Sequence, residues 1–440
     1  MRAMRLAAVA MAAAGLSLAG PAIVEAKTPA AAVKTVAPES VGFDSARLKK
    51  LDDYMAGVIA QKRVAGMTTL LVRHGKVVAF NTYGTMDGQS PMTKDAIFRI
   101  YSMSKPVTGV AMMILYEEGK WKLDDPVTKF IPEFRNLKVM TGVGPDGKPT
   151  TVPVTRPPTM REIMSHTAGF GYGLQIREPV DKMFRERGVL WSADLPDMIG
   201  KVADIPLKFQ PGTDWSYSIA VDIQGYLVEK LSGQKLGDFM QSRIFGPLKM
   251  TDTGFYTGAD KASRLAKLYQ TDIRTWQMVP ATELFGGAVP DYTKKPTLES
   301  GGGGLVSTTV DYGRFAQMLL NKGELDGARI LAPATVELMG TNVIPKPVLE
   351  TLSAKQGGSF SDAVGFGMDV MVVNDARKAG SISGDGEMSW GGAAGTWFWV
   401  DPTNDLYFVG MVQRLGGTGG EDLQIMSRLL TYQALVKPEN

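Results

Sequence analysis

Apolar residues recur along this chain with the two periods expected of helices and strands. Residues 44–61 and 107–119 carry apolar side chains three and four positions apart, which predicts two amphipathic helices. Residues 67–72 and 77–83 are apolar runs joined by a tight turn at 74–76, which predicts a β-hairpin. Further segments with these two periods predict helices at 310–322 and 421–436 and strands at 367–373, 395–400 and 406–413. This succession predicts an antiparallel sheet with helices packed on it.

The middle of the chain, residues 120–295, has a different pattern. It contains many prolines and few alternating runs, and its helical patterns are short. They lie at 194–202, 220–232 and 236–244. A length of 440 residues also exceeds a usual single core. We therefore expect an α/β (α+β) fold of two lobes, in which residues 27–119 and 296–440 form an α/β lobe and residues 120–295 form an inserted, mainly helical lobe.

Residues 1–26 have the pattern of a secretory signal peptide. Arg2 and Arg5 precede an apolar run that is too short to span a membrane, and small residues lie at the expected cleavage site. We expect export to a bacterial periplasm or to the medium, with no membrane anchor after cleavage. Cleavage removes two arginines and one glutamate, so the formal net charge falls from +3 to +2. This balance gives no indication of nucleic acid as a partner.

The strongest chemical signal is the pair Ser102 and Lys105 at the start of the predicted helix 107–119. Three residues turn a helix by about 300° and raise it by about 4.5 Å, so the two side chains share a face. A serine hydroxyl is a weak nucleophile until a neighbouring base takes its proton, and a desolvated lysine can be that base. The partial positive charge of a helix N-terminus favours an oxyanion at the same place. The pair therefore predicts a nucleophilic serine.

Other candidates have ordinary structural interpretations. Ser232 and Lys235 repeat the spacing, but Gly233 follows an apolar helix there, which favours a helix end with a solvated lysine. His74 belongs to the tight turn, and His166 follows a capping box, so we interpret both as structural. The chain has no Gly-x-Ser-x-Gly elbow. Two histidines without cysteine also argue against a zinc site.

A lysine-assisted serine needs a second proton carrier and an oxyanion hole. Tyr217 lies on a Gly/Pro loop before a predicted helix, where its side chain can project or can pack as a core aromatic. Trp390, Gly391, Gly392 and Ala393 precede the predicted strand 395–400. These glycines allow close approach of a backbone to a ligand, or they mark a bend.

Together these motifs resemble the serine β-lactamase/penicillin-binding-protein superfamily, specifically its class C-like branch with the family VIII carboxylesterases. Three motifs stand in the family's order, Ser102-x-x-Lys105, Tyr217-Ser218-Ile219 and Trp390-Gly391-Gly392. Stretches at 165–169 and 303–308 also resemble ancillary motifs of this superfamily, and the resemblance covers about residues 40–435.

The resemblance implies a fold and a set of roles. The fold is an antiparallel sheet flanked by helices, with a helical lobe and a site in the cleft between the two lobes. Ser102 is the acylated nucleophile, Lys105 its base and Tyr217 the proton relay. The backbone N–H groups of Ser102 and Ala393 form the oxyanion hole, beside Trp390, Gly391 and Gly392. No metal and no organic cofactor are implied.

Two departures from the lactamase pattern indicate the substrate. Ile219 stands where lactamases have an asparagine, and Trp390 stands where they have a lysine or histidine that suits a penicillin carboxylate. Loss of both polar groups favours an uncharged, short-chain acyl ester, with β-lactams as possible secondary substrates. The alternatives are a β-lactamase or D-Ala-D-Ala-type peptidase with weak lactam hydrolysis, an acyltransferase, and a non-catalytic penicillin-recognising module. The last would tolerate loss of Ser102, Lys105 or Tyr217, which are all present.

Overall fold

The computed structural model describes residues 33–272, 274–355, 360–416 and 420–438. The predicted signal peptide lies outside the described residues. The chain from Lys34 onward forms one compact unit, and the boundaries of the two lobes stay a prediction. Within the described ranges, no helix is both long and apolar enough to cross a membrane.

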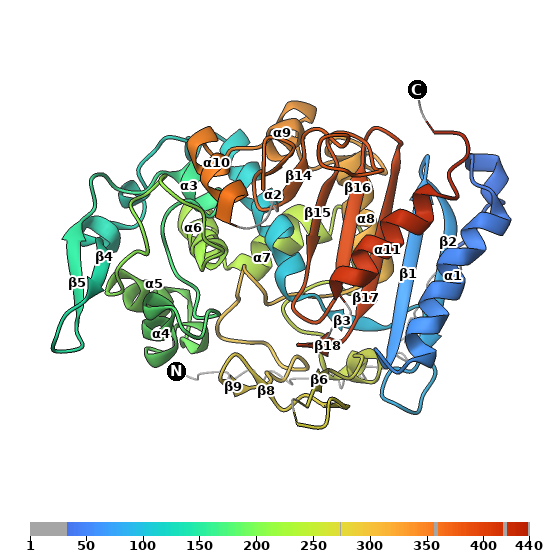
Figure 1. Ribbon diagram of the computed structural model, residues 1–440, viewed down its shortest axis with the longest axis horizontal. Helices are drawn as coiled ribbons and strands as arrows, with labels where there is room; N and C mark the ends of the chain where they lie inside the picture. The colour runs from blue at the N-terminus through green and yellow to red at the C-terminus, as the bar shows by residue number, and fades with distance from the viewer. Residues whose placement is uncertain (1–32, 273, 356–359, 417–419, 439–440) are drawn as a thin grey trace, which may run out of the picture. The chain divides into compact units, whose positions relative to one another are not determined.

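Seven strands of the described chain form the central antiparallel sheet (Figure 1). In spatial order they are β13 (Val364–Phe366), β14 (Met371–Val373), β15 (Met388–Gly391), β16 (Trp397–Asp401), β17 (Leu406–Val412), β1 (Gly66–Arg73) and β2 (Lys76–Gly84). The predicted hairpin 67–83 is confirmed as β1 and β2. The fold class is confirmed as well, because helices flank this sheet.

Helices cover both faces of the sheet (Figure 1). α1 (Ser45–Ala60) and α11 (Gly420–Tyr432) share a core cluster with Met67 and Leu71 of β1. On the other face, α8 (Thr309–Leu320) packs against β1, β16 and β17. Successive side chains of a strand point to opposite faces, so β1 needs apolar cover on both sides and is buried along its whole length.

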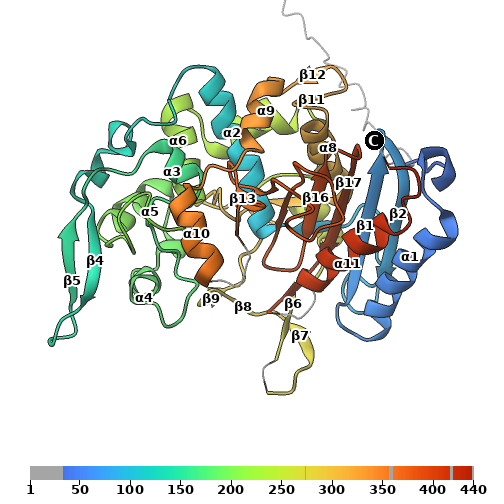
Figure 2. The same cartoon turned by 45° about the horizontal axis from the view of Figure 1, so that its top comes forward.

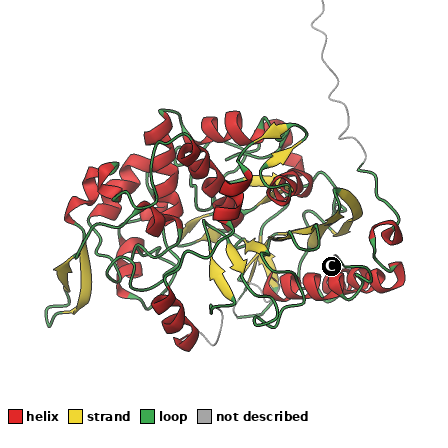
Figure 3. Ribbon diagram, turned by 90° about the horizontal axis from the view of Figure 1, so that it is seen from above, coloured by secondary structure: helices red, strands yellow, loops and turns green. Residues whose placement is uncertain are grey.

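The segment between α2 (Ser104–Glu117) and the second half of the sheet holds most of the remaining helices (Figure 2). They are α3 (Met160–Met164), α4 (Pro179–Glu186), α5 (Leu195–Ala203), α6 (Ala220–Ser232) and α7 (Leu236–Met240). It also holds an unpredicted hairpin, β4 (Lys138–Val143) with β5 (Pro149–Pro153), which projects from these helices (Figure 3). Most of its side chains are exposed or half-buried, so no apolar period marks it in the sequence.

One predicted strand is confirmed only at its end, and one strand is missed. Of the expected strand 367–373 only 371–373 is a strand, β14, whereas residues 367–370 form a turn between β13 and β14, in which the N–H of Gly367 donates to the carbonyl of Val370 at 2.9 Å. Asp369 in this turn has a φ of 62°, in the left-handed region that strands do not use. No strand is predicted at 388–391, where the glycines indicate a close approach to a ligand or a bend, but Trp390 and Gly391 belong to β15 and pair with β16.

Shorter elements complete the described chain. The strands β3 (Ile97–Arg99) and β10 (Val306–Thr308) pair with each other and bring residues 300–305 beside Ser102. The others are β6 (Tyr269–Thr271), β7 (Met278–Pro280), β8 (Glu283–Leu284), β9 (Gly287–Ala288), β11 (Glu324–Leu325), β12 (Ala328–Arg329), α9 (Pro333–Met339), α10 (Lys346–Lys355) and β18 (Arg414–Leu415).

Candidate active site

Ser102 lies in a tight turn between β3 and α2. The turn Tyr101–Met103 is a 3₁₀ helix, and α2 begins only at Ser104, so Ser102 precedes the α-helix instead of opening it. Tyr101 is buried and has a φ of 42°, which is uncommon for a bulky residue. Strained backbone of this kind is concentrated at functional sites, and here it immediately precedes the predicted nucleophile.

Lys105 is fully buried, with 0% of its surface exposed. Its Nζ donates to the carbonyl of Gly302 at 2.6 Å, to Tyr172 Oη at 3.1 Å and to Ser102 Oγ at 3.4 Å. These acceptors are uncharged oxygens. The structure therefore brings the predicted base to the predicted nucleophile and satisfies its hydrogen-bonding capacity without an ion pair among the described residues.

Tyr217 completes the cluster. Its Oη donates a hydrogen bond to Ser102 Oγ at 2.7 Å, and its ring centroid lies 4.6 Å from Lys105 Nζ. Of the two interpretations of Tyr217, a projecting side chain or a packed aromatic, the geometry fits the first. Ser102 Oγ thus contacts both proton-carrying groups that the sequence suggested for it.

His166 holds the segment that carries Tyr217. Its carbonyl accepts the N–H of Ser216 at 3.1 Å, and its Nδ1 lies 3.2 Å from the N of Ser218 and 2.9 Å from the Ser218 Oγ. Burial, and then the nearby charge of Lys105, hold the pKa of His166 well below its usual value. A neutral imidazole that accepts a backbone N–H is the structural histidine that the sequence suggested.

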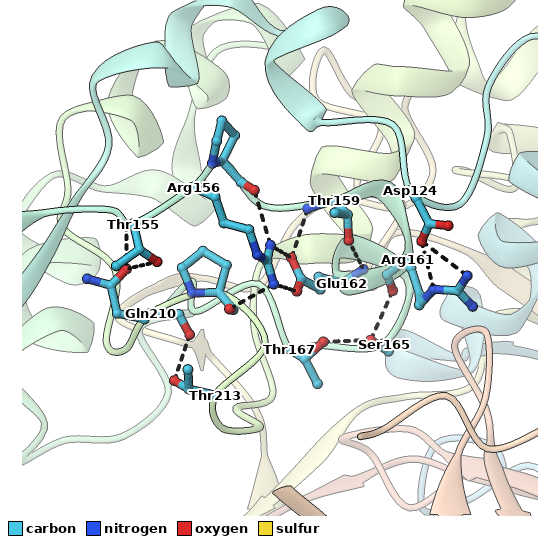
Figure 4. Close-up of polar contacts among 12 residues, drawn as sticks. Asp124, Thr155, Arg156, Thr159, Arg161, Glu162, Ser165, Thr167, Gln210 and Thr213 are labelled. Carbon is cyan, nitrogen blue, oxygen red and sulfur yellow. Dashed lines mark hydrogen bonds and ion pairs between the residues drawn. The ribbon is translucent and has the colours of Figure 1, made fainter. Parts of the chain in front are cut away.

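A polar network surrounds Thr159 and Glu162 at the start of α3 (Figure 4). The N–H of Thr159 donates to Glu162 at 2.8 Å and the N–H of Glu162 donates to Thr159 Oγ1 at 3.3 Å, so the expected capping box is present. Arg156 donates to Glu162 at 2.9 Å and also to the carbonyl of Pro211 at 3.1 Å. The network therefore joins the start of α3 to the loop that leads to Tyr217.

The end of β15 approaches the Ser102 turn closely. A Cβ on Gly392 would lie 2.3 Å from the carbonyl oxygen of Ile100, so only glycine fits there. Ala393, the next residue, lines the same cavity as Ser102. Among the described residues, no acceptor is hydrogen-bonded to the Ala393 N–H. The predicted oxyanion donors, Ser102 and Ala393, thus lie at one cavity.

The cavity has a volume of about 650 Å³, which falls within the range of small-molecule sites. Trp390 forms one wall, and its ring packs 5.7 Å from that of Tyr217 and 5.2 Å from that of Phe366. The other apolar lining residues are Leu174, Leu190, Trp191, Phe255, Leu284, Phe285, Pro290, Pro296 and Leu298. Such a lining suits an uncharged substrate with apolar groups.

No sequence pattern pointed to Tyr172, although its hydroxyl contacts Lys105. Burial raises the pKa of its phenol well above the usual value, and the charge of Asp222 adds to this effect. Tyr172 is therefore a neutral hydrogen-bond partner of Lys105. Its position three residues after the 165–169 stretch is the one local signal that could have drawn attention to it.

Known proteins are similar to this chain over most of its length. The model of the Beta-lactamase family matches residues 50–433. Protein Rv1367c from Mycobacterium tuberculosis (strain ATCC 25618 / H37Rv) is 35% identical over 80% of this chain and 86% of its own length. Esterase EstB from Burkholderia gladioli is 28% identical over 83% of this chain and 90% of its own. The structure titled "EstCE1, a hydrolase with promiscuous acyltransferase activity" has a TM-score of 0.72 at 26% identity, covering 88% of this chain and 99% of that chain.

The sheet, its flanking helices and the serine, lysine and tyrosine beside it define a protein of the serine β-lactamase and penicillin-binding-protein superfamily. Within that superfamily, the chain belongs to the Beta-lactamase family, whose model spans most of its length. The predicted family is confirmed. The finer placement among the class C-like proteins and family VIII carboxylesterases stays a prediction.

The buried carboxyl group of Asp369, which lies near Lys105, leads to a stability prediction. Its Oδ1 accepts a hydrogen bond from Gln224 at 3.0 Å, whereas its Oδ2 is buried without a hydrogen-bond partner among the described residues. Burial raises the pKa of Asp369 well above its usual value, against the smaller opposing effects of Gln224 and Lys105. Above about pH 4 the unfolded chain loses this proton and the folded protein retains it, so stability falls as the pH rises towards the folded-state pKa.

We therefore expect Asp369→Asn to increase the free energy of unfolding at neutral pH, on the order of 1 kcal/mol. Asparagine preserves the shape, the Gln224 contact and the left-handed backbone. Urea unfolding at pH 7 measures the gain, which should vanish below about pH 4, where the carboxyl is protonated in both states. The exposed Asp146→Asn is the control and should leave stability unchanged. An equal gain at pH 3.5 and pH 7 would contradict the expectation.

Proposed function

We propose that this protein is a serine carboxylesterase that cleaves short-chain acyl esters through an acyl-Ser102 intermediate. The observation that carries the proposal is the contact of Ser102 Oγ with both Tyr217 Oη, at 2.7 Å, and Lys105 Nζ, at 3.4 Å. A hydroxyl held between a buried amine and a phenol can lose its proton as it attacks a carbonyl.

The proposed reaction has two halves. Lys105 takes the proton of Ser102 as Oγ bonds to the ester carbonyl carbon, and the N–H groups of Ser102 and Ala393 stabilise the oxyanion. Tyr217 relays this proton from Lys105 to the departing alcohol, and the ester C–O bond breaks. Water then attacks the acyl group, gives up a proton through the same residues and releases the acid and Ser102.

The chemistry of the cavity supports an ester over a lactam carboxylate. Ile219 is fully buried and offers no amide to the substrate. Trp390 presents an aromatic face, because its N–H is buried. Lys294 also lines the cavity, but its side chain is largely exposed, and its Nζ forms an ion pair with Asp291 Oδ2 at 3.0 Å. EstB and EstCE1 are named as an esterase and a hydrolase, which supports the same conclusion.

Acyl transfer is the second candidate. EstCE1 is described as a hydrolase with promiscuous acyltransferase activity. The acyl-enzyme would be the same, and an alcohol would replace water as the second nucleophile.

We also propose that the protein is exported through its predicted signal peptide.

Turnover of p-nitrophenyl butyrate and of the lactam nitrocefin by the purified protein tests the proposal. We expect kcat/KM for the ester to exceed that for the lactam by at least about 100-fold. Labelling with diethyl p-nitrophenyl phosphate should add one diethylphosphoryl group, which peptide mass spectrometry should place on Ser102. Faster lactam turnover would support the lactamase alternative. The absence of both turnover and labelling would support the non-catalytic module.

A further inference from the structure

The glycine-rich turn at 300–304 is held between the two helices that build the site. From α2, the hydroxyl of Thr108 donates to the carbonyl of Gly301 at 2.8 Å. From α6, Asp222 Oδ1 accepts the hydroxyl of Ser300 at 2.5 Å and the N–H of Gly302 at 3.2 Å. Asp222 is buried, with 2% of its surface exposed, so these hydrogen bonds are shielded from water.

The turn contacts Lys105 directly through its backbone. The carbonyl of Gly302 accepts the shortest hydrogen bond of Lys105 Nζ, at 2.6 Å. A Cβ on Gly302 would lie 2.3 Å from Asp222 Oδ2 and 2.9 Å from Tyr172 Oη, so the close approach requires glycine. Asp222 therefore binds one side of the residue whose other side binds Lys105.

The hydrogen bond to Gly302 restricts the direction in which the lone pair of a neutral Lys105 can point. A lysine that acts as a base is neutral and has two N–H donors and one lone pair. If Gly302 O and Tyr172 Oη accept the two N–H groups, the lone pair is left for the third contact, Ser102 Oγ at 3.4 Å. After the proton moves from Ser102 Oγ to Lys105 Nζ, the ammonium group has three donors for the same three oxygens.

We propose that Asp222 is a positioning residue for Lys105, because it holds the Gly302 carbonyl at the place that directs the lysine lone pair to Ser102. The proposal rests on the proposed function, in which Lys105 is the base. Asp222 touches neither the substrate nor Ser102 in this account, and it acts through hydrogen-bond acceptance by Oδ1. The negative charge of Asp222 is not required.

Three variants and steady-state kinetics with p-nitrophenyl butyrate test this inference. Asp222→Ala removes both hydrogen bonds from α6 to the turn, leaves the Thr108 contact from α2, and should lower kcat by about 100-fold with KM changed less than about threefold, because misplacing a reacting group impairs the chemical step. Asp222→Asn keeps the Oδ1 acceptor and should keep kcat within about threefold of the parent protein. Ser300→Ala removes one of the two hydrogen bonds to Asp222 and should give an intermediate loss.

Gln224→Ala is the matched control, since Gln224 is buried on the same helix and its described hydrogen bonds go to Ile163 and Asp369 instead of the turn. It reports the cost of disturbing α6 and should leave kcat unchanged, and thermal unfolding checks the fold of every variant. Loss of kcat in Asp222→Asn equal to that in Asp222→Ala would overturn the inference, and so would an unchanged kcat in a folded Asp222→Ala. Absence of ester turnover in the parent protein would instead contradict the proposed function.

Discussion

Replacing Ser102 with alanine is expected to lower kcat for p-nitrophenyl butyrate by about 10⁴-fold or more, because loss of a nucleophile removes the covalent pathway. Ser102 Oγ is the atom on which Lys105 and Tyr217 converge, at 3.4 Å and 2.7 Å, so no other hydroxyl takes its place without moving both partners. The variant should also fail to take up diethyl p-nitrophenyl phosphate, which intact-protein mass spectrometry measures directly.

Ser232→Ala is the matched control for this prediction. Ser232 belongs to the second Ser-x-x-Lys match, but its hydroxyl donates to the Val228 carbonyl at 2.6 Å, and Lys235 is paired with Glu229 at 3.2 Å. These are contacts of a helix end, as expected, so this variant should keep full activity. Full activity of a folded Ser102→Ala protein, or loss of activity in Ser232→Ala, would show that Ser102 is the wrong serine.

Most of the regular elements could be predicted from the sequence because their apolar periods extend over many residues. α1 lies at Ser45–Ala60 against an expectation of 44–61, with Asp44 as the N-cap that accepts the N–H of Arg47 at 2.8 Å. α8 and β17 are equally close to their expected bounds. The polar hairpin β4–β5 and the short strand β15 were missed, since pairing with a neighbour, and not a local period, defines them.

In the candidate site, contacts between residues close in the sequence could be predicted, and contacts between residues far apart in the sequence could not. Ser102 and Lys105 are three residues apart, so helix geometry alone brings them together in the prediction. Tyr172 and Gly302 reach Lys105 from segments 67 and 197 residues away. No local pattern encodes such contacts, and the resemblance to known motifs did not include them. The 3₁₀ turn with a positive φ at Tyr101 was missed for a related reason, because packing around the turn must stabilise its strain.

The surroundings of Lys105 suggest why these distant residues matter. Burying an amine without hydrogen-bond partners is costly, and an ion pair would favour its charged form. A backbone carbonyl and two hydroxyls offer acceptors for either form of the amine. The two nearby carboxyl groups have no described hydrogen bond to Lys105. Asp222 Oδ1 accepts from the glycine turn and Asp369 Oδ1 accepts from Gln224. The site thus supplies hydrogen bonds to Lys105 while leaving it able to exchange a proton with Ser102.

Tyr217→Phe is expected to lower kcat for ethyl butyrate by about 10³-fold, within the range for loss of a positioned acid–base group. Phenylalanine keeps the ring that packs on His166 and Trp390, at 5.0 Å and 5.7 Å, but removes the hydroxyl that bonds Ser102. The loss should be smaller for p-nitrophenyl butyrate, since p-nitrophenolate departs without protonation and ethoxide does not. Release of ethanol and of p-nitrophenol, measured in parallel, gives the two rates.

Two tyrosine variants separate the relay role from general effects. Tyr226→Phe changes a half-buried phenol on α6 and should leave both rates unchanged. Tyr172→Phe removes an acceptor of Lys105 at 3.1 Å and should slow both esters by a similar factor, about tenfold, because Tyr172 has no contact with Ser102 among the described hydrogen bonds. Equal losses for the two esters in Tyr217→Phe would mean that Tyr217 orients Ser102 without protonating the leaving group. Leaving-group dependence, and not the size of the loss alone, therefore assigns the proton to Tyr217.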